Sequence, residues 1–207
     1  MRKPARPPRA RPDADGFARA PQQVRVIGGA WRRTPIPVAD VPGLRPSPDR
    51  VRETLFNWLA HLRPDTRTLR GLDLFAGTGA LGFEFASRGA GRVVLVERQP
   101  QLLRLLRGLQ AKLDARQVEI IAGDALAVAA GLPRASFDVV FLDPPFGAGL
   151  LWPAIEAVRP LLASGGLVYA EADALIAPAD AVAHGLEVVR SARAGRVCFH
   201  LLQLRNG

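Results

Sequence analysis

The sequence predicts an α/β protein whose main domain is a doubly wound, mostly parallel β-sheet, and three observations lead to this. Beyond residue 69, short apolar segments alternate with segments of helical periodicity. The strand segments are apolar throughout, which is typical of parallel strands covered by helices on both faces. The last two strand segments are separated only by a short turn, which predicts an antiparallel C-terminal pair. Such a Rossmann-like sheet binds ligands outside the carboxyl ends of its strands.

Each element of this sheet is expected from the pattern of its residues. The strands are expected at residues 72–75, 92–97, 118–122, 137–142, 166–171, 186–190 and 196–204. The helices are expected from the Gly-rich turn after residue 75 to about residue 88, and at 100–113, 125–130 and 151–162.

A small β-hairpin is expected in residues 22–46, ahead of the main domain. Val24–Ile27 reads as a strand, Gly28 and Gly29 as a turn, and Ala30–Arg32 as the start of a return strand. Pro35 and Pro37 suit only an edge position, because proline has no N–H to donate.

The main domain, residues 47–207, is expected to open with a helix. Ser47 reads as its N-cap and Pro48 as its first helical residue. Apolar residues follow at helical spacing as far as Leu62, and Pro64 ends the helix.

The composition narrows the class of protein. The chain has 207 residues, of which 48% are hydrophobic, so it can bury a substantial core. One cysteine, Cys198, excludes a disulfide framework and a cysteine-based zinc site. We expect a cytoplasmic protein with a reduced thiol, no membrane span and no metal ion, acting as a monomer.

The charge is concentrated near the N-terminus. The formal net charge is +9, and residues 1–50 hold 11 basic and 4 acidic residues, which places +7 there. Residues 1–21 contain five prolines and six Lys or Arg, so we expect a disordered basic tail. The hairpin should expose Arg25, Arg32 and Arg33. A polyanion such as RNA is the expected partner, although a solvated arm explains the tail equally well.

The first motif with chemical content runs from Asp73 to Gly82, between a strand and a helix. It contains G-x-G-x-x-G from Gly77 through Gly79, and Glu97 ends the next strand, at the spacing of a nucleotide-binding fingerprint. Asp73 would repel a pyrophosphate but attract the sulfonium and ammonium groups of S-adenosylmethionine. The motif therefore favours S-adenosylmethionine over NAD. Asp124, at the end of the third strand, suits a contact to the adenine amine or a helix N-cap.

The second motif is Asp143-Pro144-Pro145-Phe146 at the end of the fourth strand, which in this topology lies beside the first. An exocyclic amine on a nucleobase is a poor nucleophile, because its lone pair is delocalised into the ring. The Asp143 carboxylate and the Pro144 carbonyl can accept both amine hydrogens and return electron density to the nitrogen. Phe146 offers a face for stacking of the base.

These motifs resemble the class I S-adenosylmethionine-dependent amino-methyltransferases, and the flanking sequence is similar to the RsmD family in particular. The similar segments are residues 25–31, 43–58, 73–82 and 143–146. The family methylates N2 of guanine 966 in 16S rRNA of the bacterial small ribosomal subunit. The resemblance implies an S-adenosylmethionine pocket formed by the following residues: Asp73, Phe75, Gly77, Gly79, Glu97 and Asp124.

The resemblance also implies that the helix after Ser47 closes over the cofactor, with Arg50 and Thr54 as secondary candidates. One detail departs from the family, because its C-terminal Gly-Gln-Val reads Gly195-Arg196-Val197 here.

Three alternatives stay open at this point. One is another amine methyltransferase, acting on adenine N6, cytosine N4 or a protein glutamine. The second is a non-catalytic ribosome assembly factor, which would have no use for Asp143. The third is an NAD-dependent oxidoreductase, which Asp73 disfavours. The Asp-Pro-Pro-Phe motif alone does not distinguish guanine from adenine.

Overall fold

The computed structural model describes residues 23–41, 44, 46–145 and 147–205. The predicted basic tail, residues 1–21, and Phe146 lie outside the described residues. Within the described residues, no helix is long and apolar enough to cross a membrane.

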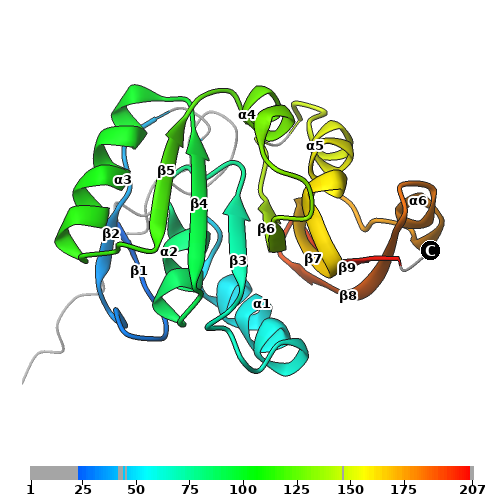
Figure 1. Ribbon diagram of the computed structural model, residues 1–207, viewed down its shortest axis with the longest axis horizontal. Coiled ribbons are helices and arrows are strands. Elements are labelled where there is room, and N and C mark those ends of the chain that lie inside the picture. The colour runs from blue at the N-terminus through cyan, green and yellow to red at the C-terminus, as the bar shows by residue number, and fades with distance from the viewer. Residues whose placement is uncertain (1–22, 42–43, 45, 146, 206–207) are drawn as a thin grey trace, which may run out of the picture.

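The centre of the structure is a seven-stranded sheet of order β5-β4-β3-β6-β7-β9-β8, with its strands side by side in Figure 1. The first five strands in this order are parallel, and β9 pairs antiparallel with β8, as predicted. β9 also pairs antiparallel with β7, which places it between the two. The strands are β3 (Arg70–Asp73), β4 (Arg92–Glu97), β5 (Val118–Ala122), β6 (Phe137–Leu142), β7 (Leu162–Ala172), β8 (Leu186–Ala194) and β9 (Val197–Leu204).

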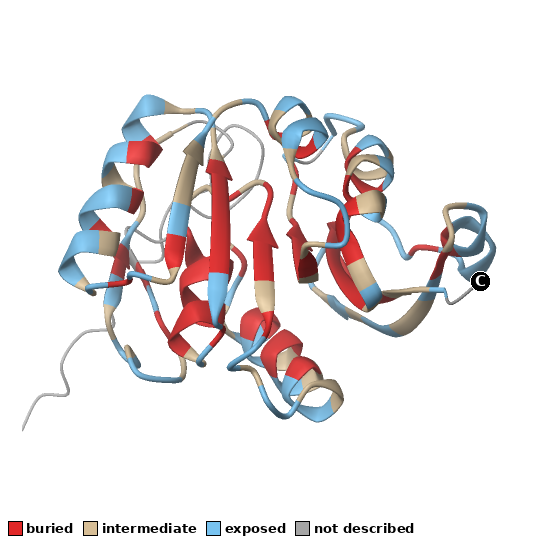
Figure 2. Ribbon diagram, in the orientation of Figure 1, coloured by how far each residue is buried: buried red, intermediate tan, exposed pale blue. Residues whose placement is uncertain are grey.

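Helices cover both faces of this sheet, which explains why its central strands are apolar on both sides (Figure 2). One core contains residues of α1 (Asp49–Leu62), α2 (Ala80–Ser87) and α3 (Pro100–Lys112). The other contains residues of α4 (Ala125–Gly131), α5 (Leu151–Val158) and α6 (Pro178–Ala183). Leu72 and Leu74 belong to the second core, so Asp73 between them faces the side of α2.

The hairpin is present, but its return strand begins later than predicted. β1 (Gln23–Arg25) pairs antiparallel with β2 (Pro35–Pro37), whereas residues 30–33 form a turn. The expectation of a strand at Ala30–Arg32 was wrong because its amides are engaged elsewhere. The Ala30 N–H donates to the Ser87 carbonyl at 2.8 Å, and the Trp31 N–H donates to Ser87 Oγ at 2.9 Å.

The turn of the hairpin is fastened to α2 through its backbone. The Glu84 carboxylate is fully buried and accepts hydrogen bonds from the N–H groups of Ile27 at 2.6 Å and Gly28 at 2.9 Å. Gly29 has φ of 78°, and a Cβ there would lie 1.9 Å from the Ser87 carbonyl oxygen, so only glycine fits this contact. The hairpin therefore packs as part of the main core.

Helix α1 begins two residues after the expected cap. The residue preceding its first turn is Pro48, and no side chain caps the helix. The prediction of Ser47 as N-cap was wrong, because its hydroxyl is hydrogen-bonded to Asp143 and Glu171. The hydroxyl that was expected to cap α1 therefore lies near the carboxyl ends of β6 and β7.

Further boundaries differ from expectation: β3 ends at Asp73 rather than residue 75, and β8 extends to Ala194 rather than residue 190. α5 ends at Val158 and a 3₁₀ turn (Arg159–Leu161) follows, where Pro160 cannot supply a helical N–H. β7 therefore starts at Leu162, earlier than predicted, and pairs with Phe137 of β6. The short helix α6 was not predicted.

Candidate active site

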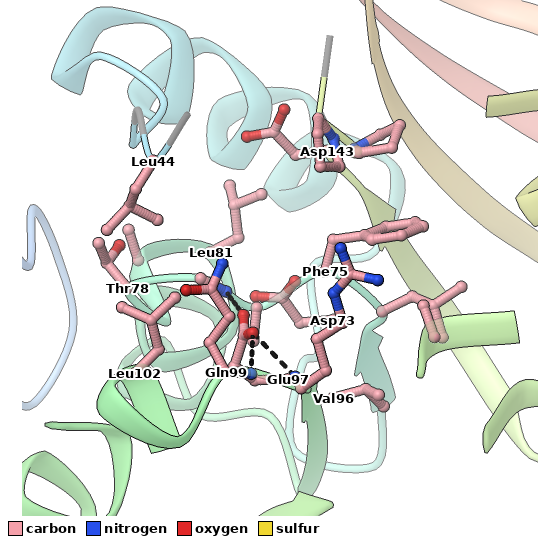
Figure 3. A pocket seen from close by; sticks show the side chains of 18 of the residues that line it. Leu44, Asp73, Phe75, Thr78, Leu81, Val96, Glu97, Gln99, Leu102 and Asp143 are labelled. Atoms are coloured by element: carbon pink, nitrogen blue, oxygen red, sulfur yellow. Dashed lines mark hydrogen bonds between the residues drawn. The ribbon is translucent and has the colours of Figure 1, made fainter. Parts of the chain in front are cut away.

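A cavity of about 320 Å³ lies at the carboxyl ends of β3, β4, β5 and β6 (Figure 3). That volume lies in the range of small-molecule sites. Its wall includes four acidic residues, one at or just after the end of each of these strands: Asp73, Glu97, Asp124 and Asp143.

Asp73 is 1% exposed and lies at the end of β3. Its Oδ2 accepts a hydrogen bond of 3.0 Å from the Gly82 N–H in the first turn of α2. Burial, together with the nearby charge of Glu97, raises the pKa of Asp73 to about 7, against the lowering effect of the backbone hydrogen bonds. A cation in the cavity would favour the ionised form.

The two glycines of the loop occupy different positions. Gly77 lines the cavity, and its N–H donates to Glu97 Oε2 at 2.9 Å. Gly79 is not part of the described cavity wall. Its φ is +78°, and a Cβ there would lie 2.6 Å from Leu106 and 2.7 Å from Phe83. Gly79 therefore lets the loop turn into α2 against the core.

Glu97 forms the corner between the Gly-rich loop and α3. Its Oε1 accepts hydrogen bonds of 2.8 Å from the N–H groups of both Arg98 and Gln99. The Glu97 carboxylate thus connects the Gly-rich loop to the residues before α3, and Glu97 also lines the cavity. Phe75 lines the same cavity and is partly exposed.

Asp124 caps the N-terminus of α4, which is one of the two roles expected for it. Its Oδ1 accepts hydrogen bonds from the N–H groups of Leu126 at 3.1 Å and Ala127 at 3.2 Å, at the start of α4. Its other oxygen lies 3.9 Å from the Arg98 guanidinium. Because it also lines the cavity, capping and a ligand contact are compatible.

The Asp-Pro-Pro segment reaches the cavity from β6, next to β3. The ladder pairs Asp73 with Phe141, so Asp143 lies two residues further along the neighbouring strand, on the same face as Asp73. Pro144 is buried and Pro145 exposed, and both line the cavity. The adjacency predicted from the strand order is therefore present.

Three residues behind Asp143 escaped the sequence reasoning. The Ser47 hydroxyl lies 3.2 Å from Asp143 Oδ2 and is also hydrogen-bonded to Glu171 Oε1. The Tyr169 hydroxyl donates to the same Glu171 oxygen at 2.8 Å. Ser47, Tyr169 and Glu171 are all buried. Tyr169 and Glu171 are two residues apart on one face of β7, but only the register of β6 and β7 shows that this face carries Asp143.

This cluster changes the acidity of its members. Burial and the charge of Glu171 raise the pKa of Asp143 well above its usual range, against the Ser47 hydrogen bond. Burial likewise raises the pKa of Glu171. Burial and the two carboxylates raise the pKa of the Tyr169 phenol, which therefore remains a hydrogen-bond donor.

The segment before α1 forms part of the cavity wall, through Leu44, Pro46 and Ser47. The secondary candidates Arg50 and Thr54 are not in the described wall. Arg50 is exposed, and the Thr54 hydroxyl donates to the Arg50 carbonyl at 2.9 Å within the helix. The cavity wall therefore includes the segment before α1 rather than these two residues of the helix.

The predicted RNA contacts Arg25, Arg32 and Arg33 are all exposed. Arg25 forms an ion pair of 3.1 Å with Asp49 at the start of α1. Arg32 and Arg33 belong to the turn held by Ser87 at the far end of α2, roughly 12 Å along that helix from the cavity. They lie apart from the candidate site.

The charge of the cavity wall bears on which ligands the cavity can bind. Four carboxylates face one cation, Arg98, among the described wall residues. This balance disfavours phosphate-bearing ligands and favours a cationic one. Within the described part of the chain, no three His, Cys, Asp or Glu side chains are grouped to hold a metal ion.

Comparison with known proteins matches residues 24–203 to the family described as Conserved hypothetical protein 95. The chain is 40% identical over 192 residues to ribosomal RNA small subunit methyltransferase D of Escherichia coli K12, covering 87% of this chain and 90% of that one. The chain belongs to the RsmD family. The namesake protein of Haemophilus influenzae is 41% identical over 158 residues, covering 73% of this chain and 79% of that one.

A solved structure is also similar to this chain. The Escherichia coli protein yhhF, described as a candidate methyltransferase, superposes with a TM-score of 0.76 at 38% identity, covering 89% of this chain and 99% of that one. The similar span includes the hairpin, the Gly-rich loop and the Asp-Pro-Pro segment, so the cavity belongs to the part that this chain shares with its relatives.

Proposed function

We propose that the chain transfers a methyl group from S-adenosylmethionine to the exocyclic N2 amine of a guanine in 16S rRNA of the small ribosomal subunit. By resemblance to the RsmD family, the target is guanine 966. The observation that carries the proposal is the placement of Asp73 and Asp143 on one face of adjacent parallel strands, at one cavity. The name of the Escherichia coli relative supports the class of substrate. A substrate in the ribosome implies a cytoplasmic protein.

The donor set fits this cofactor. S-adenosylmethionine supplies a methyl group on a sulfonium and carries an ammonium group, and both charges suit a wall with an excess of carboxylates. Asp73 and Gly77 would hold its amino-acid end, Glu97 its ribose hydroxyls and Asp124 its adenine amine. Phe75 offers an apolar contact beside them.

The chain's own contribution to the reaction is to position and polarise the amine. Asp143 accepts a hydrogen bond from one N–H of the amine and the Pro144 carbonyl accepts one from the other N–H, which makes the nitrogen lone pair available to the methyl group. The Asp143 carboxylate also stabilises the positive charge that develops on the nitrogen. Because the methyl group is already activated, catalysis depends mainly on orientation.

The test is methyl transfer to small subunits that lack the modification. The chain is incubated with isotopically labelled S-adenosylmethionine and such subunits, and the labelled nucleotide is then mapped. We expect the label on guanine N2, with less label on free 16S rRNA. Label on adenine N6 or cytosine N4 would identify another amine methyltransferase. Cofactor binding without any label would support a non-catalytic assembly factor.

A further inference from the structure

Asp143 has a second carboxylate beside it that the reaction above does not use. The ladder between β6 and β7 ends with the pair Leu142 and Ala170, and Asp143 and Glu171 are the residues that follow these two. Both lie on the face of Asp73, and Glu171 is 3% exposed. Two ionised carboxylates in neighbouring positions of a sheet destabilise it.

The hydrogen bonds of this cluster contain too few protons for two ionised carboxylates. Ser47 Oγ contacts Asp143 Oδ2 and Glu171 Oε1, yet a hydroxyl has a single hydrogen to donate. The Tyr169 hydroxyl already donates to Glu171. One carboxyl group must therefore donate to Ser47 Oγ, and so must be protonated. The raised pKa values of Asp143 and Glu171 agree with this count.

We propose that Glu171 is a positioning residue for Asp143: it retains a proton, donates it to Ser47 Oγ, and so directs the Ser47 hydroxyl hydrogen to an ionised Asp143. This proposal rests on the proposed function, in which Asp143 must accept a hydrogen from the target amine. A protonated Asp143 could direct its own O–H donor at the N–H donor of the target amine, and the two would not form a hydrogen bond. Glu171 thus determines which of the two carboxyl groups is ionised.

The groups around the pair support this assignment. Glu171 is the more deeply buried of the two, and Asp143 is partly exposed on the cavity wall, where a cationic cofactor would favour its ionised form. The charge of Asp73 on β3 raises the pKa of Asp143 and so opposes this assignment, and a cationic cofactor between the two carboxylates would offset it. From α1, Arg52 approaches Ser47 only at its backbone carbonyl, at 3.2 Å. Tyr169 on β7 contributes a neutral donor.

The decisive variant is Glu171→Gln, because its amide is uncharged at every pH, as a glutamate that retains its proton is. We expect its maximal rate above pH 8 to stay within about threefold of the wild type. Because Glu171 is already uncharged in this arrangement, the acid limb of the variant's pH–rate profile should stay at the wild-type position. Glu171→Leu and Ser47→Ala, which remove the donor chain, should lower kcat by about ten- to hundredfold. Their KM for the cofactor should change less.

The matched control is Glu156→Gln, which removes a carboxylate that is hydrogen-bonded to His184 away from the cluster. Its pH–rate profile should coincide with the wild type. If the acid limb of Glu171→Gln moves to lower pH, which would show that Glu171 is charged in the wild type, or if this variant is as inactive as Asp143→Ala, the proposal is overturned. Thermal unfolding of each variant separates misfolding from loss of positioning.

A measurement without substrate separates this proposal from the proposed function. At pH 8.5, where Asp73 is ionised, infrared spectra of the wild type should contain a protonated-carboxyl C=O band that Glu171→Gln loses and Glu156→Gln keeps. A band that persists in Glu171→Gln contradicts the retained proton on Glu171. If the band behaves as expected while no subunit is methylated, the shared proton stands and the proposed function fails.

Discussion

The carboxylate of Asp73 at the end of β3 is held by the Gly82 N–H, 3.0 Å away in the first turn of α2. This hydrogen bond orients a buried acid towards the cavity and satisfies one of the free amides of the helix end. It does not compensate fully for burial, because the pKa of Asp73 remains raised to about 7. The group therefore changes its charge near neutral pH, at the point where the cofactor is proposed to bind.

Cofactor binding should release protons around neutral pH. A cation beside Asp73 lowers its pKa, so affinity for S-adenosylmethionine should increase as pH rises from 6 to 8 and then level off. Calorimetry in buffers of different ionisation enthalpy measures the proton release. Asp73→Asn should bind more weakly and release fewer protons. An equal release from that variant would contradict the assignment.

The same group makes a prediction for stability without cofactor. The pKa of Asp73 in the folded state is about 7, above its ordinary value of 3.8, so the folded state binds more protons between these values. The free energy of unfolding should therefore fall as pH rises through this window, with a contribution approaching about 1.4 kcal/mol per pH unit. In urea unfolding, the slope of Asp73→Asn should be smaller than that of the wild type by this contribution, and the raised pKa values of Asp143 and Glu171 leave both proteins a remaining slope.

Asp143→Ala should reduce single-turnover methyl transfer by about 10²–10³-fold, because an acceptor at the developing charge is lost. Cofactor affinity should stay within a few-fold. Asp143→Asn keeps an oxygen acceptor but no charge, and should be impaired less. A near-normal rate for the alanine variant would remove Asp143 from the reaction.

Glu97→Ala should weaken S-adenosylmethionine binding by about 1.5–3 kcal/mol, the value of hydrogen bonds to a charged group. The rate at saturating cofactor should barely change. Since Glu97 also holds the amides of Gly77, Arg98 and Gln99, thermal unfolding must accompany the titration. A large fall in the saturated rate with unchanged affinity would show that Glu97 acts elsewhere.

Neutralising Arg25, Arg32 and Arg33 together should raise KM for small subunits. It should also reduce the log–log salt dependence of binding by about 0.7–0.9 per lost phosphate contact. Cofactor affinity should not change, because two of these residues lie at the far end of α2 from the cavity. A matched control neutralises three exposed arginines elsewhere, Arg67, Arg116 and Arg134. Equal effects from the two triple variants would indicate that the overall positive charge of the protein, rather than contacts of the hairpin, attracts the RNA.

The parallel sheet, the adjacency of β3 and β6 and the place of the cavity could be predicted, because they follow from apolar strands, the Gly-rich loop, acids at strand ends and the usual topology of such sheets. The first residue of α1 and the position of the hairpin's return strand, β2, could not be predicted in this way. In both cases a polar group that suits a local role, the Ser47 hydroxyl or the Trp31 amide, is used by a residue distant in sequence. Glu171 escaped for a related reason, since its pairing with Asp143 depends on the register of two strands.

The attachment of the hairpin to α2 has a consequence for how this protein can vary. The contacts of Ile27, Gly28 and Trp31 with Glu84 and Ser87 use the backbone amides of the turn, which other amino acids would also supply. Apart from glycines at the close approaches, the outward side chains of the turn are not needed to hold it in place. That surface can therefore change its amino acids, and with them its affinity for a partner, while the cavity and its chemistry stay the same.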